Sequence, residues 1–157
     1  MNDASNLRVL IVCMGNICRS PTAEVVLRQR LAAGGLDGRV EVDSAGTGGW
    51  HAGQAPDARA QRHALQRGYD LSRLRARRVV EEDFERFDLL LAMDEDNLAD
   101  LQRLKPAGGG GELRLFADAE VPDPYHGAAQ GFENVLDLIE KGSDALVLEL
   151  RGRLGTS

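Results

Sequence analysis

The chain has 157 residues, the length of one ordinary domain, and its 43% hydrophobic and 28% charged residues are typical of a globular protein. Its formal net charge of −6 argues against a nucleic-acid-binding protein, which needs basic side chains to neutralise phosphates. A polar start, Met1–Asn6, and the shortness of the apolar runs argue against a signal peptide and a membrane span. We therefore expect a single domain, residues 1–157, that acts in the cytoplasm without a nucleic-acid or membrane partner.

The expected elements alternate between strand and helix along the chain. Residues Leu7–Val12 form a nearly continuous apolar run, which is typical of a strand buried on both faces of a parallel sheet. A helix to about Ala33 follows, with Ser20 as a candidate N-cap and Pro21 at the first helical position. The next elements are a strand Val40–Ser44, a helix from Asp57 to near Gly68, a strand Asp88–Met93, a helix Glu95–Leu104 and a strand Leu113–Phe116.

Apolar spacing indicates how two of these helices pack. In the helix that Asp57 opens, the side chains expected to face inward are Ala60, His63, Ala64 and Leu65. The last helix carries an apolar stripe made of Phe132, Val135, Leu136, Ile139, Leu146, Val147 and Leu150. Because strand and helix alternate four times, we expect an α/β fold, a four-stranded parallel sheet with helices on both faces.

The most informative stretch is the loop between the first strand and the first helix, Cys13-Met14-Gly15-Asn16-Ile17-Cys18-Arg19-Ser20-Pro21. Such a loop aims backbone N–H groups inward, and with the helix N-terminus they form an anion-binding cradle. The positive field there favours the thiolate of Cys13, and the planar guanidinium of Arg19 suits two oxygens of one phosphoryl group. In parallel sheets, ligands bind at the carboxyl ends of strands, where this loop lies. The residues predict a thiolate nucleophile under a phosphate.

These residues resemble the signature loop of the low-molecular-weight protein tyrosine phosphatases, C-x-G-N-[I/T]-C-R-S-P. A second stretch, Val121-Pro122-Asp123-Pro124-Tyr125, is similar to the family's late Asp-Pro-aromatic motif, and the resemblance also runs through residues 43–47 and 88–94. The resemblance covers nearly the whole chain. It implies a flavodoxin-like sheet of the phosphotyrosine phosphatase I type and hydrolysis of protein phosphotyrosine through a phosphocysteine, with inorganic phosphate as product and no cofactor.

The resemblance assigns three catalytic roles. Cys13 attacks the phosphorus atom, Arg19 binds the phosphoryl oxygens, and Asp123 acts as general acid and then as general base. From the residues alone, Cys13 could equally be a small core residue, and Asp123 could simply form a turn with the proline that follows. Asp118 and Glu120 are rival carboxylates in the same region, but only Asp123 matches the Asp-Pro-aromatic pattern.

The other loop residues are assigned to phosphate binding and loop shape. The phosphate-binding residues are Met14, Gly15, Asn16, Ile17, Cys18 and Ser20. The resemblance implies that Asn16 takes a left-handed backbone conformation, which asparagine tolerates well, supported by Ser44. It also implies that Ser20 both caps the helix and bonds the Cys13 thiolate. Cys18 is either a core residue or a resolving thiol that condenses with oxidised Cys13, which would make activity redox-sensitive.

Two aromatic residues are candidates for the substrate rim, Trp50 and Tyr125, although a lone tryptophan is more often a core residue. His126 stands where a second tyrosine is common in eukaryotic members, so control by paired tyrosine phosphorylation is not carried over. The three histidines, His51, His63 and His126, have no spacing that indicates a metal site, and two thiols in one loop do not suit zinc. We expect no metal.

Four functions remain open at this point. An apolar side chain at Ile17 favours an aryl phosphate, since relatives acting on phosphoarginine tend to carry threonine there, but a protein-arginine phosphatase is the alternative. Arsenate reduction needs cysteines downstream of Cys18, and none occurs. A non-catalytic phosphate-binding module is the third alternative. The expected partners are tyrosine-phosphorylated proteins, a bacterial tyrosine kinase among them.

Overall fold

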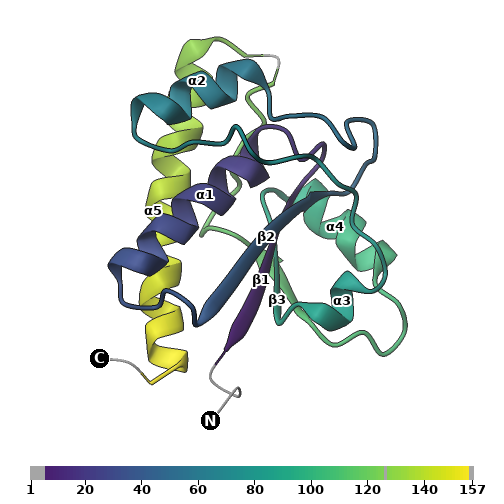
Figure 1. Cartoon of the computed structure of the whole chain (residues 1–157). Coiled ribbons are helices and arrows are strands. Elements are labelled where there is room, and N and C mark those ends of the chain that lie inside the picture. Colours follow the sequence, from purple (N-terminus) through teal and green to yellow (C-terminus); the bar gives the residue numbers. More distant parts are fainter. Residues whose placement is uncertain (1–5, 126, 156–157) are drawn as a thin grey trace.

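Four parallel strands form one sheet in the order β2-β1-β3-β4 (Figure 1). A computed structural model describes residues 6–125 and 127–155, so Met1–Ser5, His126 and residues 156–157 lie outside the described part. The strands are β1 (Leu7–Cys13), β2 (Val40–Gly46), β3 (Leu89–Ala92) and β4 (Glu112–Leu115). The helices are α1 (Arg19–Ala33), α2 (Ala58–Gln66), α3 (Asp83–Arg86), α4 (Glu95–Leu104) and α5 (Ala129–Arg153).

Strand β1 is apolar from Val9 onward, because both of its faces are covered there. Val9 and Ile11 belong to the core cluster shared with α1 and α5. Leu10 and Val12, which alternate with them, belong to the cluster on the opposite face. All four side chains are fully buried, as expected for a parallel strand between two helical layers. The same alternation directs Cys13 toward the layer of α1 and α5.

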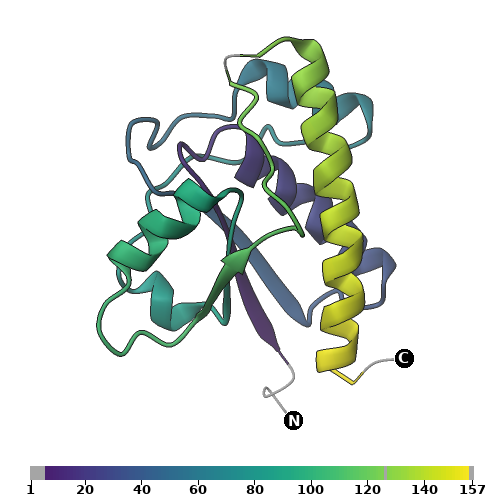
Figure 2. The same ribbon diagram turned by 180° about the vertical axis from the view of Figure 1, so that it is seen from behind.

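The helices form two layers, one on each face of the sheet. Helices α1, α2 and α5 lie together on one face, and α3 and α4 lie on the other (Figures 1 and 2). All seven residues of the apolar stripe in α5 are buried. The predicted fold class, a four-stranded parallel sheet with helices on both faces, is therefore confirmed. No helix within the described residues is both long and apolar enough to cross a membrane.

Three details differ from the expectation. Helix α3 was not predicted, because four residues are too few to show a helical period. The prediction that Leu65 faces inward is wrong, since its side chain is 61% exposed. The prediction that Ser20 caps the first helix is also wrong: α1 begins at Arg19, after Cys18, and its start has no side-chain cap. By contrast, Asp57 caps α2 and accepts hydrogen bonds from two backbone N–H groups of its first turn.

Strand order places the Cys13 loop at the topological switch point of the sheet. The chain leaves β1 for β2 on one side and later crosses to β3 on the other side, and ligands bind at such a point in open α/β sheets. Cys13 is the last residue of β1, paired in register with Gly46 at the end of β2. Met93 and Asp94 follow the end of β3. Three carboxyl-terminal strand ends therefore meet around one loop.

Candidate active site

The loop between β1 and α1 offers a row of backbone donors. Residues 14–18 belong to neither a helix nor a strand. Within the described part of the chain, the N–H groups of Met14, Gly15, Ile17 and Cys18 donate to no protein acceptor, while that of Asn16 donates to the Cys13 sulfur. Free N–H groups at a helix N-terminus are the physical basis of anion binding. The predicted phosphate cradle therefore has the donors that it needs.

The Cys13 sulfur lies at the centre of this loop. Its side chain is 3% exposed, and the backbone N–H of Asn16 donates to the sulfur over 3.3 Å. The Ser20 hydroxyl lies 3.0 Å from the same sulfur. The Asn16 side-chain amide donates to the Ser20 oxygen over 2.8 Å, so the Ser20 hydroxyl proton can be donated to the Cys13 sulfur or to the more distant Ala45 carbonyl, 3.5 Å away. The sulfur is thus in contact with one backbone N–H of the loop and one hydroxyl of the helix that follows it.

Asn16 holds the loop in shape through its backbone and its side chain. Its φ of 58° is the one left-handed value among the described non-glycine residues. Its amide nitrogen also donates to the Ser44 hydroxyl over 3.1 Å, and its oxygen accepts from the backbone N–H of Arg77 over 2.9 Å. Two groups from distant parts of the chain, with Cys13 and Ser20 nearby, thus fix a single residue of the loop, as a strained position requires.

Replacing Asn16 should separate the contribution of its left-handed backbone from that of its side-chain hydrogen bonds. In Asn16→Ala, the left-handed backbone and the lost hydrogen bonds together should lower the free energy of unfolding by about 2–4 kcal/mol. In Asn16→Gly, the backbone conformation carries no steric cost, so the loss should be smaller. Urea unfolding of the two variants and the wild type measures the difference. A glycine variant that is less stable than the alanine variant would contradict the importance of the left-handed conformation.

A buried carboxylate ends the hydrogen-bond chain behind the loop. The Ser44 hydroxyl donates to Glu24 Oε1 over 2.7 Å, and Glu24 is only 2% exposed. Burial raises the pKa of Glu24, while the Ser44 hydrogen bond and the Arg28 guanidinium, 2.7 Å away, oppose that rise. The chain from Glu24 through Ser44, Asn16 and Ser20 therefore reaches the Cys13 sulfur. Ser44 supports the loop from behind and lies away from the cavity.

Arg19 is fixed beneath the cavity by one group that follows β3 and another that follows β4. The residue is 1% exposed, and its Nη1 donates to Asp94 Oδ2 over 2.7 Å and to the Val121 carbonyl over 2.9 Å. Burial alone would lower the pKa of Arg19, but the facing anionic groups Cys13, Asp94 and Asp123 raise it above its usual range. The guanidinium is thus permanently charged and held at one edge, with its other edge toward Asp123.

The Asp123 carboxylate faces Arg19 from the loop before α5. Its Oδ2 lies 3.7 Å from Arg19 Nη2, and its side chain is 41% exposed. Its Oδ1 accepts the backbone N–H of Tyr125 over 3.0 Å, which is the turn geometry expected of an aspartate before proline. Asp123 therefore forms the expected turn and also faces the site, because the turn directs its second carboxylate oxygen toward Arg19.

Arg59 ties the Asp123 loop to the start of α2. Its Nη2 donates to the Tyr125 carbonyl over 2.7 Å, and its guanidinium lies 5.5 Å from the centre of the Tyr125 ring and 5.0 Å from that of Phe132. Asp57 accepts two further hydrogen bonds from the same guanidinium. The backbone N–H of Asp57 in turn donates to the Ile17 carbonyl over 2.8 Å. The phosphate loop and the Asp123 loop are thus linked through Arg59 and Asp57.

One cavity of about 330 Å³ brings most of the predicted residues together. Its lining consists of Cys13, Met14, Gly15, Ile17, Cys18, Arg19, Trp50, His51, Asp123 and Tyr125. Trp50 is 70% exposed, so it is not the core residue that a lone tryptophan often is. A Cβ atom at Gly48 would lie 1.7 Å from the Trp50 ring, so only glycine there allows the indole to take this position.

Cys18 lies in the wall of the same cavity but is almost completely buried. Its exposed fraction is 5%. Burial, with smaller contributions from the Asp57 and Cys13 charges, raises the pKa of the Cys18 thiol far above its usual range. It therefore stays a neutral thiol at physiological pH, unlike a nucleophile.

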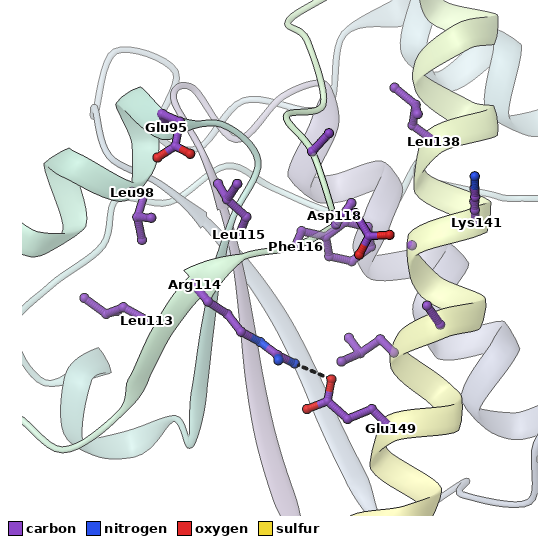
Figure 3. A pocket seen from close by; sticks show the side chains of 15 residues that line it. Glu95, Leu98, Leu113, Arg114, Leu115, Phe116, Asp118, Leu138, Lys141 and Glu149 are labelled. Atoms are coloured by element: carbon purple, nitrogen blue, oxygen red, sulfur yellow. Dashed lines mark hydrogen bonds and ion pairs between the residues drawn. The ribbon is translucent and has the colours of Figure 1, made fainter.

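A larger cavity of about 640 Å³ lies between α4, β4 and α5 (Figure 3). Leu98, Leu113 and Leu138 line it, and an ion pair between Arg114 and Glu149, 2.7 Å long, crosses its edge. It contains no thiol and none of the residues predicted for the site. Although this cavity has the larger volume, Cys13, Arg19 and Asp123 line the smaller one, which is therefore the candidate active site.

Sequence reasoning missed four residues that the structure places in or beside the site. They are Glu24, His51, Asp94 and Arg59. The sequence gives no local signal for Asp94 and Arg59, because their contacts join residues 75 and 66 positions apart. His51 was considered only as a metal ligand, yet it lines the cavity, and its ring centre lies 6.2 Å from that of Tyr125.

Known proteins with similar sequences and structures share one family. The family model described as Low molecular weight phosphotyrosine protein phosphatase matches residues 8–154. A Streptomyces coelicolor protein named low molecular weight protein-tyrosine-phosphatase is 42% identical over 154 residues, which cover 92% of this chain and 93% of that protein.

Two solved structures have the same fold. A protein tyrosine phosphatase from Entamoeba histolytica, crystallised with Hepes in its active site, is 36% identical with a TM-score of 0.90, and the match covers 94% of this chain and 99% of that one. An arginine phosphatase from Drosophila is 31% identical with a TM-score of 0.83, covering 90% and 96%. By sequence and by fold, this chain belongs to the low molecular weight phosphotyrosine protein phosphatases, a family of hydrolases that act on phosphoproteins.

Proposed function

We propose that this protein hydrolyses phosphotyrosine on proteins through a phosphocysteine formed on Cys13. The observation that carries the proposal is the convergence of Cys13, Arg19 and Asp123 on one cavity of about 330 Å³. A nucleophile, a fixed cation and a carboxylate are the three groups that a two-step phosphoryl transfer to cysteine needs. We expect one domain, residues 1–157, to supply all of them.

In the first step, the Cys13 thiolate attacks the phosphorus atom and the bond between phosphorus and the tyrosine oxygen breaks. Arg19 and the loop N–H groups hold the three equatorial oxygens as their charge develops. Asp123, protonated at this stage, gives its proton to the leaving phenolate. The product is a phosphocysteine and a free tyrosine side chain.

In the second step, water attacks the phosphocysteine. The Asp123 carboxylate takes a proton from that water, the bond between phosphorus and sulfur breaks, and inorganic phosphate leaves. The Cys13 thiolate is regenerated, and the hydroxyl of Ser20, 3.0 Å away, stabilises it as a leaving group. Asn16 donates to the Ser20 oxygen, which keeps that oxygen beside the Cys13 sulfur.

The cavity walls favour an aryl phosphate. Trp50 and Tyr125 provide aromatic surface at the rim, and Ile17 provides apolar surface inside. A planar phenyl ring is stabilised by such surfaces, whereas a guanidinium prefers a hydroxyl neighbour. Phosphoarginine remains the second candidate substrate, because the chain also shares its fold with a solved structure described as an arginine phosphatase.

A substrate comparison tests this function. Wild type is assayed with a phosphotyrosine peptide, a phosphoserine peptide and a phosphoarginine substrate, all in the presence of a metal chelator. Hydrolysis of phosphotyrosine alone is the expected result. A preference for phosphoarginine would keep the mechanism and overturn the interpretation of Ile17. No hydrolysis of any substrate would favour a phosphate-binding module.

We further propose that Cys18 protects Cys13 during oxidation. Hydrogen peroxide converts the Cys13 thiolate to a sulfenic acid, and condensation with the Cys18 thiol forms a disulfide and releases one water molecule. Both residues line the same cavity, which supports this step. The raised pKa of Cys18 means that the attacking thiolate is scarce, so condensation should be faster at alkaline pH.

Cys18→Ser should make inactivation by peroxide harder to reverse. Without a resolving thiol, the sulfenic acid is open to further oxidation, which thiol reagents do not reverse. The measurement is the activity recovered with dithiothreitol after a fixed exposure to peroxide, in wild type and in the variant. Equal recovery in the two proteins would refute the resolving role.

The cellular setting is the last part of the proposal. The chain has two cysteines, both in one loop, which is not a structural disulfide framework of the kind that secreted proteins use, and this supports action in the cytoplasm on tyrosine-phosphorylated proteins. A bacterial tyrosine kinase that phosphorylates itself is one candidate substrate. Fractionation of the source cells, followed by phosphotyrosine blotting with and without the gene, would test both statements.

A further inference from the structure

A second cavity, about 280 Å³ in volume, opens beside the candidate active site. Its lining consists of Met14, Thr47, Trp50, Arg78, Asp100, Arg103 and Leu104. Met14 and Trp50 also line the cavity that contains Cys13, so the two cavities meet at these side chains. A substrate held over Cys13 would reach the second cavity by passing Met14 and Trp50. We call this second cavity the Arg78 groove.

Backbone pairing places Arg78 beside the phosphate loop. Arg78 forms an isolated parallel bridge with Gly46 at the end of β2. On its two sides, the Gly46 N–H donates to the Arg77 carbonyl and the Val79 N–H donates to the Gly46 carbonyl, both over 2.8 Å. Gly46 is itself in register with Cys13. The position of Arg78 is therefore set by the same strand ends that set the active site.

Arg78 carries the uncompensated positive charge of the groove. Asp100 and Arg103, the other charged residues there, form an ion pair with each other. For Arg78, the described ranges 6–125 and 127–155 contain no ion-pair partner, and its side chain is exposed. The neighbouring Arg77, by contrast, is neutralised by two aspartates at 3.0 Å. In a chain with a net charge of −6, such a site is a local attraction for an anion.

We propose that the Arg78 groove binds an acidic side chain that lies close to the phosphotyrosine in the protein substrate. The proposal rests on the proposed function, because it concerns the residues that flank a phosphotyrosine seated over Cys13. An aspartate or glutamate supplies the carboxylate that a guanidinium binds with paired hydrogen bonds. Because the groove is open to water, the gain is modest and depends on salt.

Two phosphotyrosine peptides test the inference. In one, the residues on both sides of phosphotyrosine are aspartate and glutamate, and in the other they are asparagine and glutamine. A small aryl phosphate reports whether the enzyme works at all. Wild type should have the higher kcat/KM for the acidic peptide, and Arg78→Gln should reduce the ratio of the two kcat/KM values by about two- to fivefold. This reduction should shrink as ionic strength rises.

Arg62→Gln is the matched control, since it removes the same charge from an exposed position on α2. Equal ratios for the two peptides in wild type, or equal changes in Arg78→Gln and Arg62→Gln, would overturn the groove while leaving the proposed function intact. If wild type hydrolyses neither the peptides nor the aryl phosphate, the proposed function fails and the inference fails with it. A ratio that falls only in Arg78→Gln supports the groove.

Discussion

Cys13→Ser should lower turnover by more than about a thousandfold while the protein still binds phosphate. A serine hydroxyl is a far weaker nucleophile than a thiolate, and it makes a poor leaving group in the second step. The anion cradle is built from backbone N–H groups and Arg19, which this change leaves in place. The measurement pairs steady-state hydrolysis of an aryl phosphate with isothermal titration of inorganic phosphate.

The contrast between these two measurements identifies the role of the thiol. Loss of both turnover and phosphate binding would indicate a collapsed loop, and Cys18→Ser provides the control for a serine placed in the same loop. Retained turnover in Cys13→Ser would refute the nucleophile. Incorporation of ³²P from labelled substrate into wild-type protein, and its absence in the variant, would show the phosphocysteine directly.

Asp123→Ala should slow hydrolysis according to the leaving group. For a phenol with a pKa of about 10, loss of the general acid should cost about 10²–10⁴ in kcat. For a strongly activated phenol, which leaves without protonation, the loss should be much smaller. Asp123→Asn keeps an oxygen that accepts the Tyr125 N–H, so it separates the acid from the turn. The measurement is kcat across a series of aryl phosphates.

The two rival carboxylates give the control. Glu120 accepts a hydrogen bond from the backbone N–H of Glu95 at the start of α4, and Asp118 lines the cavity between α4, β4 and α5. Asp118→Asn and Glu120→Gln should therefore leave the leaving-group dependence unchanged. An equal loss for activated and unactivated substrates in Asp123→Ala would remove Asp123 as the acid.

Predictions from the sequence were accurate where the determining contacts are local or repeated. Helix α4 runs from Glu95 to Leu104, as expected, because Asp94 caps it and its period is clear. β1 was recognisable because a strand covered on both faces carries a nearly continuous apolar run, here Val9–Val12. The loop after it could be identified from neighbouring residues alone. Strands β1 and β2 end one and two residues beyond the expected limits, at Cys13 and Gly46, whereas β3 and β4 each end one residue earlier than expected, at Ala92 and Leu115. Such differences are normal for element boundaries.

Predictions failed where one residue had two competing uses. Ser20 has the side chain and the position of an N-cap, but Asn16 and the Cys13 sulfur engage its hydroxyl instead. Leu65 matches a helical period, yet α2 is short and contacts α5 along a narrow face centred on Ala60 and Ala64. The partners of the Ser20 hydroxyl and the exposure of Leu65 both depend on tertiary contacts, which the local sequence pattern does not specify.

The Arg59 tether has a consequence for the timing of catalysis. The Arg59 guanidinium joins the Asp123 loop to Asp57 at the start of α2. Because the Asp57 N–H in turn donates to the Ile17 carbonyl of the phosphate loop, the acid and the nucleophile belong to one continuous framework. The entropic cost of ordering that loop is therefore met once, when the chain folds, and does not recur with each substrate. In enzymes that close a lid over their substrate, the lid motion often limits kcat. In this protein we expect a chemical step to limit the rate, so that kcat is insensitive to solvent viscosity.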